Sequence, residues 1–168
     1  MTTGMWHERQ FYNKNKGLAE RHRAQYHIHW KSKHIVADYQ KSILYEMRLD
    51  HYDDNGESIQ RIRVGPHLYN ENLTNVIFNE FQLDIETGTN YSLIDGREAK
   101  AMLRYSNDGG RTWSNYLEKN IGKPGEFKHR VIWRRLGVAR DRVWEIMVSD
   151  PVKVVISGAY VNLQECLK

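Results

Sequence analysis

The chain has 168 residues, with 25 Lys and Arg against 21 Asp and Glu and a formal net charge of +4, which suits one ordinary domain or two small β units. The interspersed charges give a mixed surface rather than the clustered basic face of a nucleic-acid-binding protein. No apolar run approaches the roughly 20 residues of a membrane span, residues 1–10 show no signal-peptide pattern, and the single Cys166 excludes an internal disulfide.

Residues 24–49 are predicted to form three consecutive strands. Apolar and polar side chains alternate with a period of two over 24–31, and polar turns follow at 31–33 and 40–42. Three short strands joined by three-residue turns form a β-meander, the unit from which propeller blades are built. One such unit cannot cover both of its faces and needs neighbours from this chain or another.

A second hairpin is predicted around Asn55-Gly56, the strongest short hairpin signal, which would join 51–52 to a strand over 59–64. The polar stretch 67–75 then reads as the join between two units. Helix-like spacing occurs only at 13–23, where it is short and polar.

The second half predicts further strands separated by turn residues. They lie at 76–85, 101–105, 130–136, 142–149 and 152–163, with a loop over 87–100 and a return strand starting at Trp113; the last of them is apolar enough to be central. The predicted fold is all-β, with a propeller-blade-like β-meander over 4–66 followed by an antiparallel β-sandwich over 76–163.

One motif lies inside the predicted sandwich. Residues 106–113 fit the Asp-box pattern Ser-x-Asp-x-Gly-x-Thr-Trp at its fixed positions, Ser106, Asp108, Gly110, Thr112 and Trp113. Gly109 and Gly110 suit the positive φ angles of a tight turn, and Asp108 can accept hydrogen bonds from the backbone of that turn. Trp113 would pack its ring under the hairpin. This chemistry is structural, so the motif favours all-β architecture and no particular activity.

No metal or cofactor site is predicted. His27 and His29 share one face of a strand, near His34 and Asp38, but a clear fourth ligand is missing, and a polar surface explains them better. Residues 50–56 resemble a calcium loop only superficially, because the alternating ligands and the final Glu are missing. A hairpin turn is the better interpretation.

Five arginines crowd thirteen residues: Arg130, Arg134, Arg135, Arg140 and Arg142. Together with an Asp box, they suggest the hypothesis that the protein is a sialidase, an enzyme in which an arginine trio holds a substrate carboxylate. No paired acid and nucleophile accompanies them, so no catalytic residue is predicted and the protein is not expected to be an enzyme. The arginines are predicted to be assembly contacts, or to tie a loop at 140–142 through ion pairs. Trp113, Trp133 and Trp144 are predicted to be core residues, with an exposed carbohydrate platform as the other reading.

The longer strings give a sharper signal than the Asp box alone. Trp-Arg-Arg-Leu-Gly at 133–137 and Ala-Arg-Asp-Arg at 139–142 follow 103–115 at a fixed spacing. They resemble the C-terminal region of the tail-hub proteins of short-tailed bacteriophages, also called packaged-DNA stabilisation proteins or tail accessory factors. Segments at 6–9, 21–24, 43–46 and 81–84 agree in the same order, so the resemblance covers about residues 4–161, which is the last third of the longer family members.

The resemblance implies a structural virion protein of the phage tail, assembled in the host cytoplasm. It would join the portal and adaptor proteins to the tail needle or tailspikes and help retain packaged DNA. Its partners would be other phage tail and portal/adaptor proteins and further copies of itself in a ring, with no membrane and at most indirect DNA contact. The loop 87–100 and the basic region 130–142 are the expected contact surfaces. The alternative is a carbohydrate-binding module or a remnant of a glycan-degrading, sialidase-like propeller; a non-functional prophage relic is a third reading.

Overall fold

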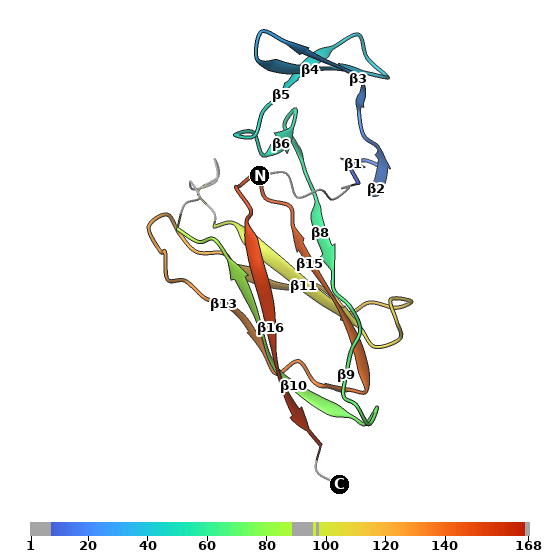
Figure 1. The fold of residues 1–168 in the computed structure, drawn as a ribbon, viewed down its shortest axis with the longest axis vertical. Helices are drawn as coiled ribbons and strands as arrows, with labels where there is room; N and C mark the ends of the chain where they lie inside the picture. Colours follow the sequence, from blue (N-terminus) through green and yellow to red (C-terminus); the bar gives the residue numbers. More distant parts are fainter. Residues whose placement is uncertain (1–7, 89–95, 97, 167–168) are drawn as a thin grey trace. The chain divides into compact units, whose positions relative to one another are not determined.

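The computed structural model describes residues 8–88, 96 and 98–166 (Figure 1). Every regular element in these residues is a strand, and the strand pairs are antiparallel, which confirms the all-β prediction. Within them there is no helix with the length and apolar character to cross a membrane. The chain divides into two compact units, Met1–Ile59 and Gln60–Lys168.

The first unit consists of small antiparallel sheets. Its strands are β1 (Gln10–Asn13) paired with β2 (Leu18–Arg21), the three-stranded sheet β3 (Ala24–Trp30), β4 (Lys33–Asp38) and β5 (Leu44–Met47), and β6 (Asp53–Asp54) paired with β7 (Glu57–Ser58). The β3-β4-β5 sheet is the predicted meander. Lys31 and Ser32, with φ angles of 45° and 62°, make its first turn, because a two-residue hairpin turn that matches strand twist needs positive φ. Val36 is the single buried hydrophobic residue in the described part of this unit.

The second unit starts earlier in the chain than the sequence suggested. We expected the first domain to extend to Pro66, with 59–64 pairing in a hairpin with 51–52. Instead β8 (Arg61–Val64) and β9 (Leu68–Tyr69) pair with β15 (Asp141–Val148) in the sandwich. The Asn55-Gly56 turn closes directly on the two-residue strands β6 and β7, and the buried strand β15 needs hydrogen-bond partners along its backbone.

Two sheets form the sandwich. One has the order β12 (Leu117–Asn120), β11 (Lys100–Ser106), β15 and β8, with β9 also paired to β15. In the other, β10 (Val76–Ile85) pairs with β13 (Val131–Arg134) and β14 (Val138–Ala139) along one edge and with β16 (Ile156–Glu165) along the opposite edge (Figure 1).

The core between these sheets is aromatic at its centre. The Trp144 ring contacts Phe78, Phe81 and Tyr105, with ring centroids 5.6, 4.9 and 5.6 Å away. Phe78 and Phe81 are three residues apart, a spacing that would put them on opposite faces of a regular strand. The register of β10 shifts between Phe78 and Glu80, and this bulge turns both rings into the core.

The last strand differs from its prediction. We expected a central strand over 152–163, but β16 spans 156–165 and, in the described residues, pairs with β10 alone. It is therefore an edge strand, and most of its residues are exposed. Its apolar composition suggested burial on both sides, which the fold does not supply.

Candidate functional site

The predicted Asp-box residues form a loop after β11 that is held by its own side chains. Asp108 accepts hydrogen bonds from the backbone N–H groups of Arg111 and Thr112 at 3.0 and 2.9 Å and from the Thr112 hydroxyl at 2.6 Å. The buried Ser106 hydroxyl donates to Asp108 and accepts from Gly110 N–H at 2.8 Å. The hydrogen bonds from Thr112, chiefly that of its hydroxyl, lower the pKa of Asp108 well below its usual range. The Asp108 carboxylate therefore serves to hold the loop in which it lies.

Trp113 lies outside the core, contrary to our expectation. It is half-buried, and the Arg104 guanidinium sits over its ring at 4.8 Å from the centroid. The predicted return strand does not start there, since β12 begins only at Leu117. Trp133 and Trp144 are core residues. Trp113 follows a loop that ends on the outer face of the sheet, so its ring meets a guanidinium instead of the aromatic cluster.

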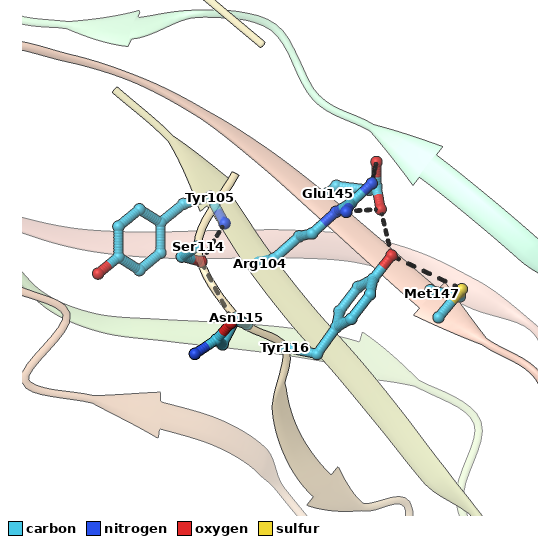
Figure 2. A network of polar contacts seen from close by, with 7 residues as sticks. All are labelled: Arg104, Tyr105, Ser114, Asn115, Tyr116, Glu145 and Met147. Carbon is cyan, nitrogen blue, oxygen red and sulfur yellow. Dashed lines mark hydrogen bonds and ion pairs between the residues drawn. The ribbon is translucent and has the colours of Figure 1, made fainter. Parts of the chain in front are cut away.

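A polar network joins β11, β15 and the segment before β12 (Figure 2). The guanidinium of Arg104 donates two hydrogen bonds to the carboxylate of Glu145, at 2.7 and 2.9 Å. The Tyr116 hydroxyl donates to the same carboxylate at 2.8 Å. Arg104 also lies over the Tyr116 ring, 4.7 Å from its centroid. One guanidinium therefore packs against two aromatic rings and one buried carboxylate.

The electrostatics of this network favour a fixed structure over proton transfer. Burial, followed by the Glu145 carboxylate, raises the pKa of Tyr116 to about 12, so its hydroxyl stays protonated at neutral pH and remains a donor. The hydrogen bond to Glu145 raises the pKa of Arg104. Sequence reasoning did not find this network. The signal in the sequence was Glu145, a charged residue inside the apolar strand 141–148. In the structure Glu145 lies directly opposite Arg104 of β11.

Arg142 is a core residue, not the assembly contact that we expected. It is 1 % exposed, and it donates to the Leu136 carbonyl at 2.6 Å and to Asn107 Oδ1 at 2.8 Å. Its guanidinium lies over the rings of Phe78, Tyr105 and Trp144, at 4.2, 4.0 and 5.2 Å from their centroids. Burial lowers its pKa. Instead of the expected ion pairing within Arg140-Asp141-Arg142, the Asp141 carboxylate makes a hydrogen bond with the His67 ring at 2.8 Å.

The four remaining arginines of the basic region are exposed. Arg134 pairs with Glu80 at 3.0 Å, and Arg130 donates to Gln82 on the same strand. Arg135 has a φ angle of 60° and directs its N–H to the Asn79 carbonyl opposite the bulge of β10. These side chains come from one edge of the β10 sheet, while Arg140 follows β14.

Two other predicted features can be placed in the first unit. His27 and His34 stack on one face of the meander with ring nitrogens 2.9 Å apart, and the His29 ring is tilted against His34 at 4.9 Å between centroids. Asp53 caps the Asn55-Gly56 turn by accepting from Gly56 N–H at 2.7 Å. Across residues 8–88, 96 and 98–166, no group of three or more His, Cys, Asp or Glu side chains is arranged to hold a metal ion. Most of the expected contact loop 87–100 lies outside the described residues.

Comparison with known proteins gives one family. The family model described as Bacteriophage P22 Gp10, beta-sandwich, matches residues 60–164. The match begins at the residue where the second compact unit begins. No curated protein matches the chain.

Proposed function

The chain belongs to the family of the bacteriophage P22 Gp10 β-sandwich, and from that premise we propose that it is a structural protein of a phage tail. More specifically, we propose a component of a tail hub that joins the portal and adaptor proteins to the tail needle or tailspikes and helps retain packaged DNA. It would work as a ring of copies in the virion after assembly in the host cytoplasm, with at most indirect contact to DNA.

The observation that carries this proposal is the family match over the whole sandwich. The state of the polar side chains supports it. Asp108, Arg104, Glu145 and Arg142 are all engaged in hydrogen bonds within the sandwich. Groups held this way stabilise a scaffold, and we propose that the protein is not an enzyme.

Arg130, Arg134, Arg135 and Arg140 are the proposed contacts with other virion proteins. An exposed guanidinium presents a planar fork of donors that matches a carboxylate on a partner. Arg142 is removed from this set because it is buried.

The test is the presence of the chain in purified virions of the phage or induced prophage that encodes it. We expect it in the tail fraction, cross-linked to portal or adaptor proteins. A double variant, R134E with R135E, should fold but enter virions at least about tenfold less efficiently if these arginines are contacts; Arg111→Glu, another exposed arginine, is the matched control. Absence from virions, together with saturable binding on a glycan array or sialidase activity, would replace the hub proposal with the carbohydrate-binding one.

A further inference from the structure

One face of the meander is apolar and lies open to solvent. The register of β3, β4 and β5 puts Tyr26, Ile28, Trp30 and Leu44 on the same side of the sheet. Between 54 % and 71 % of the surface of each of these residues is exposed. The same side also carries Lys33, opposite Trp30, and Glu46, opposite Ile35 and level with Ile28. These two charges pair with each other at 3.0 Å, and Lys31 lies over the indole ring of Trp30. We call Tyr26, Ile28, Trp30 and Leu44 the meander face. Exposed apolar patches of this kind mark interaction sites.

The second open surface is the edge of the sandwich at β16. No charged residue occurs from Val154 to Gln164, whereas the edge strands β8, β12 and β13 each carry at least one charge. Charges, prolines and shortness are the usual protections of an edge strand, and β16, with ten residues, has none of them along this run. Its apolar side chains are exposed too, with Tyr160 at 63 % and Leu163 at 42 %.

At this edge, apolar side chains next to the core are not covered by a further strand of the described residues. Ala159 lies opposite the buried Leu83, and Leu163 lies opposite the buried Phe78, yet both β16 residues remain exposed. Water can solvate the backbone of this edge, but the apolar side chains beside the core gain free energy when another surface covers them. We call Ile156, Ala159, Tyr160 and Leu163 the β16 edge.

We propose that these two surfaces bind each other between copies, the meander face of one chain covering the β16 edge of the next. Each surface is mainly apolar, the charges on the meander face being paired with each other, and each chain carries both surfaces. Two unlike surfaces that meet between copies form a head-to-tail contact, which closes into a ring when the rotation allows. The inference rests on the ring of the proposed function and names the surfaces that would make it.

The size of the contact agrees with this pairing. Two half-exposed aromatic rings and two aliphatic side chains give the meander face roughly 500 Å² of apolar surface. Covering it with a β16 edge of similar size buries on the order of 1,000 Å², which is at the lower limit for a biological interface and corresponds to a weak contact in each pair of copies. The paired Lys33 and Glu46 at the rim add no net charge.

A mixing experiment with the full chain tests the contact. Ile28→Glu disables the meander face, and Tyr160→Glu disables the β16 edge; both side chains are more than half exposed, so neither change removes core packing. Leu49→Glu in the first unit and Val138→Glu in the second are the matched controls, because both residues are exposed outside the two surfaces. Mass in solution is measured over a concentration series by light scattering.

We expect the wild-type chain and both controls to assemble beyond a dimer. Each of the two disabling variants alone should associate at least about tenfold more weakly, while their equimolar mixture forms a one-to-one heterodimer through the surface that each retains. That heterodimer also shows that both variants are folded. A wild-type chain that stays monomeric, a mixture that stays monomeric, or a Tyr160→Glu variant that self-associates as strongly as the wild type would overturn the proposal.

The outcomes remain separate from those of the virion test. A monomeric chain found in virions removes the head-to-tail contact and keeps the tail function. A chain that assembles as described but is absent from virions keeps the contact and removes the function.

Discussion

Arg142 shows how a charged side chain can act as a core residue. Its guanidinium donates to a backbone carbonyl and to a side-chain amide, and its planar faces pack on the rings of Phe78, Tyr105 and Trp144. Hydrogen bonds and ring faces together replace the water that the charge loses on burial. The side chain links β15 both to the Asn107 position of the Ser106–Trp113 loop and to Leu136.

We predict that Arg142→Ala lowers the free energy of unfolding by about 3–5 kcal/mol, because it leaves a cavity among aromatic rings and removes the donors to Leu136 and Asn107. Urea unfolding monitored by tryptophan fluorescence measures the change. Arg140→Ala, at an exposed neighbouring position, should stay within about 0.5 kcal/mol of the wild type. Equal effects of the two substitutions would contradict the burial of Arg142.

Asp108 makes the stability of its loop dependent on pH. Hydrogen bonds, first from the Thr112 hydroxyl and then from the Thr112 N–H, lower its pKa in the folded protein. A lowered folded pKa contributes stability that is fully present above the unfolded value, about pH 4, and is lost as the pH falls towards the folded value.

Asp108→Asn should therefore melt at a lower temperature than the wild type at pH 7. The gap between the two melting temperatures should narrow as the pH falls below about 4, where the wild-type carboxylate begins to lose its advantage. Differential scanning calorimetry from neutral to acid pH measures this gap. Asp84→Asn, at an exposed position of β10, is the control for the loss of one surface carboxylate. A gap that stays constant to low pH would argue against the lowered pKa.

At the scale of elements, the Arg104–Glu145 pair locks β11 to β15 on the outer face of the sheet. The two residues are directly opposite each other in the register, and Tyr116 brings in the segment before β12 through its hydrogen bond to the same carboxylate. The side chain of Glu145 is 6 % exposed and that of Arg104 27 %, so solvent screens this pair less than it screens a surface pair.

A double-mutant cycle with Arg104→Ala and Glu145→Ala should give a coupling energy of about 1–3 kcal/mol. Loss of Arg104 leaves a buried carboxylate with Tyr116 as its remaining side-chain donor in the described network, so the single variants should be more destabilised than the coupling alone implies. The more exposed pair of Lys100 and Glu118 on neighbouring strands, with side chains 42 % and 51 % exposed, serves as the control cycle, expected at about 0–1 kcal/mol. A coupling energy near zero for Arg104 and Glu145 would show that the network does not hold the two strands together.

Local signals predicted individual strands well and their partners poorly. The period-two pattern located β3 and β10 at their observed bounds, because alternation separates the two faces of a strand. It did not say whether the apolar face is covered, since that face is buried in β10 and exposed in β3. It could not say that 61–64 pairs with a strand about eighty residues later, since β-pairing is non-local and the Asn55-Gly56 turn offered a nearer partner. Arg142 and Glu145 were misread or missed for the same reason: two of the three rings around Arg142, and the arginine that pairs with Glu145, come from β10 and β11.

At the scale of the whole molecule, the two units differ in how they are stabilised. The described residues of the first unit bury Val36 alone among their hydrophobic side chains, whereas the second encloses a continuous core from Val76 to Val152. Small sheets with uncovered faces are only marginally stable by themselves. The sandwich should therefore resist opening far better than the meander.

Amide hydrogen exchange of the full chain tests this difference. We expect backbone amides of β10, β11 and β15 to exchange at least about a hundredfold more slowly than those of β3, β4 and β5 when the protein is dilute, since local opening costs less where few side chains are buried. If the meander face is covered by the β16 edge of another copy, raising the protein concentration should slow exchange in β3–β5 and in β16 while leaving β10, β11 and β15 unchanged. Equal protection of both units in dilute solution would mean that the meander is stabilised by something other than its own packing. Protection that rises with concentration in the sandwich core alone would place the contact between copies elsewhere on the chain.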